Sequence, residues 1–223
     1  IKSRNEIKPS EKKPVIIKHY ASSMLYFAGS DCYLTEYSGD WAKEVNESSQ
    51  KLSFGKKILD TKLGSRANMF TPPFFTIGFG QVAKENEGLV LMGTLSWTGN
   101  FRFTFEVDNK DNLRVISGIN PEASHYQLDP EKVFKTPEFV FTLSNKGRGK
   151  GSRDIHRWAR KYQLKDGEGD RMTLLNNWEA TSFDFDETKL ANLMQEAKGL
   201  GVDMFLLDDG WFGNKYPRHN DIQ

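Results

Sequence analysis

Two adjacent carboxylates follow an apolar segment near the C-terminal end of the sequence. Asp208 and Asp209 come directly after residues 202–207, which are apolar except for Asp203, and Trp211 follows them. Ionised carboxylates accept paired hydrogen bonds from hydroxyl groups, and an indole ring packs against the C–H face of a pyranose while its N–H donates. The side chains of residues 206–214 are therefore of the types that bind a sugar in a pocket. The alternative interpretation is a strand that turns into solvent, with Trp211 capping a core.

The segment upstream of these carboxylates predicts how they are positioned. Residues 172–178 have the pattern of a short buried strand that ends at Trp178, and Asp186 occupies the N-cap position of a helix. The apolar stripe of that helix consists of Leu190, Leu193, Met194 and Ala197. A strand, a helix and a second strand form a parallel pair whose carboxyl ends lie side by side, so Trp178 should lie beside Asp208 and Asp209. In α/β barrels this edge carries the chemistry.

Several short motifs resemble those of one enzyme family. The motifs LNNWEA (175–180), the FD that follows it (183–184), and LDDGWFG (207–213) resemble the first two strand ends of the catalytic barrel in the glycoside hydrolase family 36 α-galactosidases. The motifs GSR (64–66), SWTGNF (96–101), SGIN (117–120) and TPE (136–138) resemble the amino-terminal β-sandwich of the same enzymes.

The resemblance implies a role for each candidate site residue. Asp208 and Asp209 would hold hydroxyls of a terminal galactose, at O4 and O6, and Trp178 would line the same subsite. Trp211 would contribute a wall of that subsite, or alternatively pack beneath the loop. The predicted partner is a galactose-containing oligosaccharide, and the family forms homo-oligomers, commonly tetramers.

We expect no catalytic residue within this chain. A retaining glycosidase needs two carboxyl groups roughly 5 to 5.5 Å apart. The family takes its nucleophile from a Lys-x-Asp motif on a later strand and its acid/base Asp from a strand beyond that, so both are expected downstream of Gln223. A complete (β/α)8 barrel needs about 250 residues, and only residues 171–223 follow the sandwich. We therefore expect a truncated fragment that is inactive alone.

The upstream two-thirds of the chain predicts antiparallel β-structure. In residues 101–107, phenylalanine and valine alternate with polar residues, which buries one face of a strand. Further strands are predicted at 15–18, 24–27, 32–37, 89–97, 113–119 and 138–144. The predicted fold is an antiparallel, supersandwich-like β-sandwich followed by the first βαβ portion of a (β/α)8 TIM barrel.

The predicted domains are a sandwich at residues 1–147, a connector with an interdomain helix at 148–170, and the start of the barrel at 171–223. Residues 145–151 are basic and rich in glycine, which indicates a solvated hinge, with Ser152 capping the helix that follows. The basic start, residues 2–14, indicates a mobile terminus or a loop without partner strands.

Composition excludes several other classes of function. The chain has 31 Lys and Arg against 30 Asp and Glu, so a net charge of +1 gives no reason to expect nucleic acid or an anionic membrane. A single cysteine, Cys32, excludes an internal disulfide, and the four histidines lack metal-ligand spacing. We expect no metal and no cofactor, and a soluble protein of either the cytoplasm or the periplasm.

The leading functional hypothesis is a fragment of a retaining exo-α-galactosidase, which removes terminal α-linked galactose from oligosaccharides. One alternative is a non-catalytic carbohydrate-binding or oligomerisation domain. Another is a galactosyltransferase similar to raffinose synthase, which would pass the galactose to a sugar acceptor instead of water.

Overall fold

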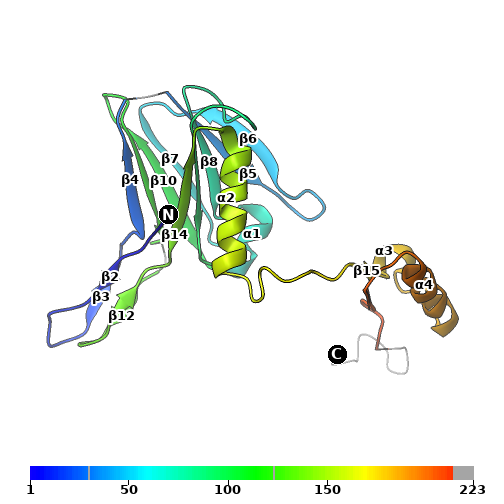
Figure 1. Ribbon diagram of the computed structural model, residues 1–223. Coiled ribbons are helices and arrows are strands. Elements are labelled where there is room, and N and C mark those ends of the chain that lie inside the picture. The colour runs from blue at the N-terminus through cyan, green and yellow to red at the C-terminus, as the bar shows by residue number, and fades with distance from the viewer. Residues whose placement is uncertain (30, 123, 213–223) are drawn as a thin grey trace. The chain divides into compact units, whose positions relative to one another are not determined.

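A computed structural model describes residues 1–29, 31–122 and 124–212. The chain divides into two compact units, Ile1–Lys165 and Asp166–Gln223, called unit 1 and unit 2 (Figure 1). This division falls inside the predicted connector, and the domain boundaries after residues 147 and 170 stay predictions.

Two antiparallel sheets form the body of unit 1. The six-stranded sheet has the order β1-β14-β9-β8-β5-β6, with bounds Lys2–Ser3, Phe139–Ser144, Val90–Leu95, Phe74–Phe79, Cys32–Ser38 and Asn46–Lys51. The four-stranded sheet has the order β4-β11-β10-β7, with bounds Ser23–Phe27, Leu113–Ile119, Phe101–Val107 and Gly55–Asp60. The predicted antiparallel sandwich is confirmed.

The core between the two sheets is built from phenylalanine. Phe101, Phe103 and Phe105 of β10 are fully buried, as their alternation predicts. Phe75, on β8 of the other sheet, meets Phe103 and Phe105 edge to face, with ring centroids 5.0 and 4.9 Å apart. Edge-to-face contacts add to the free energy gained from burying the rings. Phe139 of β14 is also fully buried.

The N-terminal segment has its partner strands within the chain, so the prediction of a mobile terminus or an unpartnered loop is wrong. β1 pairs with β14. β2 (Glu6–Ile7) pairs with β13 (Phe134–Lys135), and β3 (Val15–Ile17) pairs with β12 (Tyr126–Leu128). The strand predicted at 15–18 is confirmed as β3, whereas β1 and β2 have two residues each, too few for a hydrophobic period to reveal them in the sequence.

Three of the quoted sandwich motifs meet in a polar cluster. Asn100 accepts a hydrogen bond from the N–H of Gly64, at 2.7 Å, through its side chain and one from the N–H of Asn120, at 3.0 Å, through its backbone. The Asn120 amide donates to the carboxylate of Asp60, which Arg102 also binds. The short helices η1 (Gly64–Arg66) and α1 (Ala67–Phe70) follow. These hydrogen bonds give Asn100 and Asn120, the asparagines of the motifs, a structural role.

Helix α2 (Gly147–Tyr162) differs from the prediction at its beginning. The glycine-rich residues 145–151 are not a solvated hinge, and Ser152 is not an N-cap, because the helix already begins at Gly147. Gly147, Gly149 and Gly151 are buried, and a Cβ on Gly151 would lie 2.5 Å from the sulfur of Met92 on β9. Glycine thus lets the helix lie close against the sheet.

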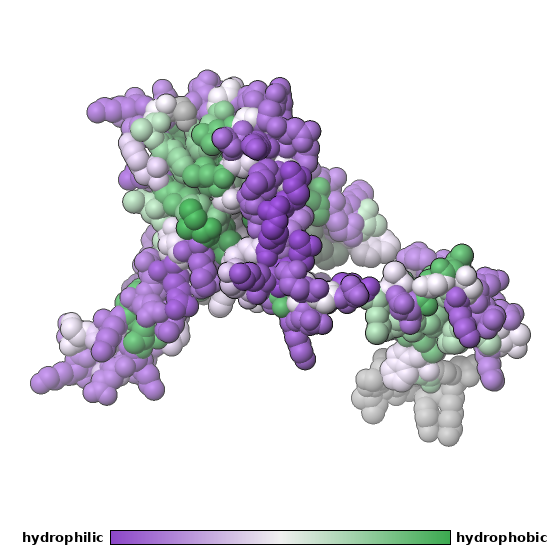
Figure 2. All heavy atoms as spheres, in the orientation of Figure 1, coloured by the Kyte–Doolittle hydropathy of each residue, from purple (hydrophilic) through white to green (hydrophobic). Residues whose placement is uncertain are grey.

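The first N–H groups of α2 are already hydrogen-bonded. Those of Gly147, Arg148 and Gly149 donate to the carbonyls of residues 88, 84 and 85, at 3.1, 2.8 and 2.9 Å. Further along the helix, Ile155 packs against Val90 and Met92 of β9. The helix is therefore part of unit 1, and its outward surface is hydrophilic (Figure 2).

Four strands of the sandwich were not predicted, namely β1, described above, and β6, β7 and β8. β6 (Asn46–Lys51) is exposed along its whole length and polar, so it shows no alternation, whereas β8 is buried on both faces. β7 buries Leu59 but carries two lysines at its start. In β14 a period of two would place Leu143 inward with Phe139 and Phe141, but this side chain is 46% exposed.

Unit 2 has the predicted order of a strand, a helix and a strand. β15 (Leu174–Asn176) and β16 (Met204–Leu206) pair in parallel, with Asn176 opposite Leu206. Between them lie the short helix α3 (Trp178–Thr181) and helix α4 (Glu187–Gly199). The Asp186 carboxylate accepts a hydrogen bond from the N–H of Lys189 at 2.8 Å, so the predicted N-cap is confirmed.

Cys32, the single cysteine, is 3% exposed within β5. In the part of the chain that the structure describes, no helix combines the length and the apolar character needed to cross a membrane.

Candidate functional site

The candidate site lies where β15 and β16 end. Because the strands are parallel, the residues that follow them leave the sheet at the same edge. The side chain of Asn176 connects the residues that follow the two strands. Its Nδ2 donates to Oδ2 of Asp208 at 2.5 Å, and its Oδ1 accepts from the N–H of Trp178 at 2.8 Å. Asp208 and Trp178 therefore lie at one edge of the sheet, as the sequence predicted, with Asn176 bonded to both.

Asn177 also connects the residues that follow the two strands. This residue is 1% exposed, and its Oδ1 accepts from the N–H of Asp208 at 2.8 Å. Its Nδ2 donates to the hydroxyl of Thr181 at 3.0 Å, and its own N–H donates to the carbonyl of Leu206 at 3.3 Å. A buried amide whose polar atoms are paired in this way holds the loop after each strand in one position.

The carboxylate of Asp208 is held in its ionised form. The hydrogen bond from Asn176, and then one from the N–H of Asp209 at 2.7 Å, lower the pKa of Asp208 below its ordinary value. The two bonds fall on different oxygens, so each oxygen keeps lone-pair capacity for another donor. This carboxylate is arranged to accept hydroxyl hydrogen bonds at neutral pH, and it is a poor general acid.

Asp209 is partly buried, and its Oδ1 accepts from the N–H of Gly210 at 3.1 Å. Gly210 has a φ of +96°, and a Cβ at this position would lie 3.1 Å from the rings of Phe183 and Phe185. Only glycine satisfies both constraints without strain. The turn after the two carboxylates is thus set by Gly210.

The two candidate tryptophans differ in their surroundings. Trp178 is partly buried and meets Phe183 edge to face, with ring centroids 4.9 Å apart. Trp211 is 66% exposed and contacts Phe212, with centroids 5.7 Å apart, so within the described residues it does not pack beneath the loop. Gly213 and Asn214, which complete the sequence motif, lie outside the described residues. The binding roles of Asp208, Asp209, Trp178 and Trp211 stay predictions.

The opposite edge of the same strands has a carboxylate of similar bonding. Oδ2 of Asp203 accepts from the N–H and from the hydroxyl of Thr173, both at 2.8 Å, and these bonds lower the pKa of Asp203. This pair ties the beginnings of the two strands together. Asp203 therefore provides a matched control for Asp208.

Sequence reasoning missed Asn176 and Asn177 as residues of this site. Their signal was present, because two consecutive amides directly follow an apolar strand and precede a tryptophan. Among the described residues, no group of three or more His, Cys, Asp or Glu side chains is arranged to hold a metal ion.

Comparisons with known proteins fall on one family. The sequence matches the glycosyl hydrolase family 36 N-terminal domain over residues 1–129 and the melibiase domain over residues 133–223. It is 32% identical over 212 residues to alpha-galactosidase C of Emericella nidulans, a match that covers 94% of this chain and 28% of that protein.

Solved structures agree with the sequence matches. Crystal structures of variants of the α-galactosidase AgaA from Geobacillus stearothermophilus, in complex with raffinose or with stachyose, superpose with TM-scores of 0.85 and 0.86 at 29% identity. Each superposition covers 95% of this chain and 30% of the AgaA chain. The chain thus spans under a third of the length of the relatives it matches.

Proposed function

This chain belongs to glycosyl hydrolase family 36, and from that premise we propose that a protein of its relatives' full length containing it is a retaining exo-α-galactosidase. In this proposal, the chain supplies the sandwich and part of the galactose subsite. The nucleophile and the acid/base are carboxylates that lie downstream of residue 223. One observation carries the proposal. The ionised carboxylate of Asp208 accepts two hydrogen bonds, and Asn176 holds it beside Trp178.

The chemistry of the strand ends supports a terminal galactose as the ligand. Asp208 offers acceptor capacity on both oxygens, which suits two neighbouring hydroxyls of one sugar ring. Asp209 follows directly and adds acceptors, while Trp178 and Trp211 offer aromatic faces for the C–H side of the ring. Since adjacent carboxylates that bind hydroxyls of one ring cannot flank its anomeric carbon, we assign them to binding.

Kinetics of the longer protein test this assignment. Asp208→Ala should raise KM and lower kcat, decreasing kcat/KM for a nitrophenyl α-galactoside by roughly 100-fold or more, because hydroxyl contacts strengthen in the transition state. Asp203→Asn alters a similarly bonded carboxylate at the other edge and should leave kcat/KM within about threefold. Equal effects of the two substitutions would remove Asp208 from the site.

The chain by itself gives a second test. We expect purified chain to release no nitrophenol from the same galactoside, and to show galactose-dependent shifts of the Trp178 indole resonance that Asp208→Ala abolishes. Measurable turnover by the chain would contradict the assignment of catalysis to later residues. Adding an acceptor sugar to the longer enzyme, and analysing the products, would distinguish hydrolysis from galactosyl transfer.

We also propose that the longer protein forms homo-oligomers through its sandwich. Met24, Tyr26 and Ile58, on the outer face of the four-stranded sheet, are 59%, 56% and 44% exposed. Light scattering of the longer protein tests this proposal, and a monomer at micromolar concentration would contradict it.

A further inference from the structure

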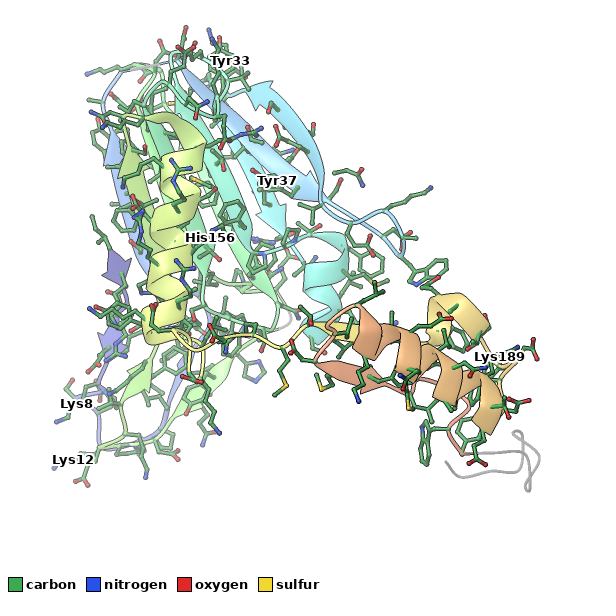
Figure 3. All side chains as sticks on the ribbon, turned by 45° about the vertical axis from the view of Figure 1, so that its right-hand side comes forward. Lys8, Lys12, Tyr33, Tyr37, His156 and Lys189 are labelled. Carbon is green, nitrogen blue, oxygen red and sulfur yellow. The ribbon has the colours of Figure 1, made fainter. Side chains whose placement is uncertain are left out.

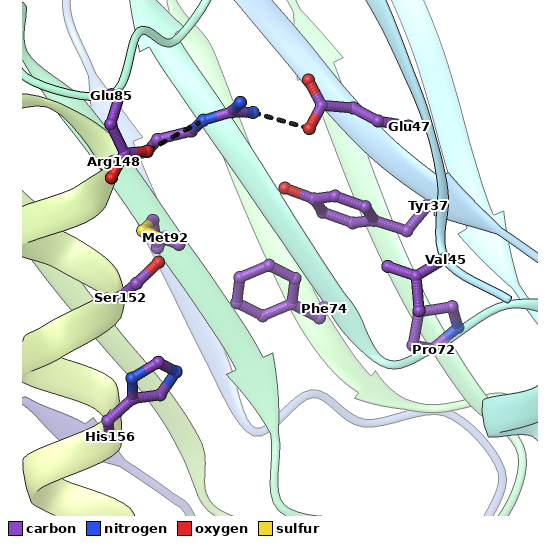
Figure 4. Close-up of a pocket in the computed structure, with 10 residues that line it drawn as sticks. All are labelled: Tyr37, Val45, Glu47, Pro72, Phe74, Glu85, Met92, Arg148, Ser152 and His156. Carbon is purple, nitrogen blue, oxygen red and sulfur yellow. Dashed lines mark hydrogen bonds and ion pairs between the residues drawn. The ribbon is translucent and has the colours of Figure 1, made fainter.

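A groove in unit 1 lies between helix α2 and the strands beside it (Figure 4). Its volume is about 490 Å³, and the residues that decide its chemistry are Tyr37, Glu47, Phe74, Arg148, Ser152 and His156. We call it the helix groove, and we propose that it binds a neutral pyranose, a site separate from the strand ends of unit 2. The proposal does not depend on the galactosidase activity.

One wall of the helix groove is aromatic. Tyr37 of β5 and Phe74 of β8 lie next to each other, with ring centroids 5.4 Å apart and ring planes inclined by 37°. Both side chains are only partly buried, and Val45 and Pro72 extend this wall. Aromatic faces of this kind pack against the C–H face of a sugar ring.

The facing wall is a row of polar side chains on α2. Arg148, Ser152 and His156 are spaced four residues apart, so they lie on one face of the helix. The His156 side chain extends from α2 on the side that faces Tyr37 of β5, which is the side of the helix groove (Figures 3 and 4). The row provides a guanidinium, a hydroxyl and an imidazole, which can donate to or accept from hydroxyl groups.

The glycines of α2 explain why this space exists. Gly151 and Ile155 of the helix rest on β9, at Met92 and Val90, and Gly147 and Gly149 lie against residues 84–87. Residues 151 and 155 are four positions apart, so the contact with β9 takes place on one face of the helix. The larger side chains at positions 148, 152 and 156 lie on a different face and line the groove. The helix is therefore fixed in place without filling the groove.

The charges of the helix groove favour a neutral ligand over an anion. Nη1 of Arg148 binds Glu47 at 2.6 Å, and its Nε lies 3.6 Å from Glu85. One guanidinium between two carboxylates leaves a net charge of −1 on the three side chains, so an anionic ligand would be repelled. The carboxylates and the remaining guanidinium N–H groups suit hydroxyls, as does the Tyr37 hydroxyl, which is 3.3 Å from that of Thr76.

Nuclear magnetic resonance of the 223-residue chain tests the proposal. The probe is methyl α-D-glucopyranoside, which is neutral and is not the sugar proposed for the strand ends. We expect saturable shifts of the Tyr37 and His156 ring resonances, with a dissociation constant on the order of 1–10 mM. The glucuronide of the same ring, which carries a carboxylate, should bind at least about tenfold more weakly.

Substitutions locate the binding. Ser152→Trp fills the helix groove and should weaken binding at least about tenfold, whereas Arg153→Trp, at the next and exposed position of α2, should leave the dissociation constant within about twofold. If Ser152→Trp disturbs the fold, the double substitution Ser152→Ala and His156→Ala should still weaken binding about fivefold. Asp208→Ala should have no effect on this binding.

Three results would overturn the proposal. They are an absence of saturable shifts at Tyr37 and His156 up to about 100 mM probe, unchanged affinity of both groove variants, and equal binding of the glucuronide. Each of these results leaves the proposed function of unit 2 untouched, because that function is tested with galactosides and with Asp208.

Discussion

The two units of this chain are held together by different interactions. In unit 1, phenylalanines from two sheets meet in a large apolar core. In the described part of unit 2, Ala197 is the single buried apolar side chain and Asn177 the single buried polar one. There, hydrogen bonds of Asn176, Asn177 and Asp203 tie strands whose Leu174 and Leu206 are 46% and 44% exposed.

This difference determines which kind of substitution affects each unit. A packed core distributes free energy over many contacts, so removing atoms from it destabilises the whole unit. A polar network depends on a few atoms, so removing one leaves its partners unpaired while distant contacts remain. We expect the sandwich to respond to changes of volume, and the strand ends to respond to changes of hydrogen-bonding groups.

The largest effect should come from truncation of the core. Phe103→Ala should lower the free energy of unfolding of unit 1 by about 3–5 kcal/mol, because it removes a fully buried ring and leaves a cavity. Ile58→Ala, on a strand paired with the same β10 but 44% exposed, should change it by less than about 0.5 kcal/mol. Urea unfolding followed by circular dichroism measures both. Equal effects would mean that the apolar core does not hold unit 1 together.

A smaller effect is expected from the buried amide of unit 2. Asn177→Leu keeps the approximate volume but removes the acceptor of the Asp208 N–H, at a cost of about 1–3 kcal/mol. Faster hydrogen exchange of the Asp208 amide is the measurement. Asn192→Leu makes the same change at an exposed position of α4 and should leave this exchange rate unaltered. Protection of Asp208 that survives Asn177→Leu would contradict the proposed role of the polar network.

The third prediction concerns ionisation at the candidate site. Asn176→Ala should raise the pKa of Asp208 toward its ordinary value of 3.8, since the largest cause of its lowering is removed. Carboxyl ¹³C titration measures this pKa. Thr173→Ala should instead raise the pKa of Asp203 and leave that of Asp208 unchanged. If both substitutions shift both carboxylates, the two edges are not independent.

The sign of the pH dependence follows from the same bonds. The folded chain holds Asp208 at a lower pKa than the unfolded chain does, so the unfolded state binds this proton more readily. The stabilisation from ionised Asp208 is present above 3.8 and is lost as the pH falls through the folded pKa. Asn176→Ala should make unit 2 less sensitive to acid over this range.

The smallest effect on stability should come from the surface ion pairs of the sandwich. Glu122 binds Lys62 and Arg102, and these partners lower its pKa to about 2. Lys62→Gln should raise this pKa toward 4.5 while leaving the unfolding of unit 1 unchanged, because exposed pairs contribute little. Carboxyl titration and urea unfolding measure the two quantities. A clear loss of stability would weaken the contrast between a core-held and a hydrogen-bonded unit.

Sequence patterns predicted strands in which apolar and polar side chains alternate, and a helix whose N-terminus is capped by a side chain. The alternating phenylalanines of β10, the Asp186 cap and the parallel pair in unit 2 all follow from local periodicity, and the structure has them. The convergence of Trp178 and Asp208 at one edge followed from that topology alone.

Elements that depend on distant partners escaped prediction. β6 has no buried face, so only its pairing with β5 makes it a strand. The glycines of α2 indicate a hinge when read locally, and they are helical because Met92 and the carbonyls of residues 84–88 leave room for nothing larger. Asn177 is buried through bonds to residues about thirty positions away, which no local pattern shows.

Because Cys32 is buried, the reactivity of its thiol can measure how often unit 1 opens. Its thiol is the only one in the sequence and is shielded within β5, so a colour-forming thiol reagent should react no faster than unit 1 opens. Unit 2 contains no cysteine and cannot contribute to that signal. At a reagent concentration high enough for reaction to outpace reclosing, the rate at low urea would therefore report the lifetime of the closed sandwich, without any added label.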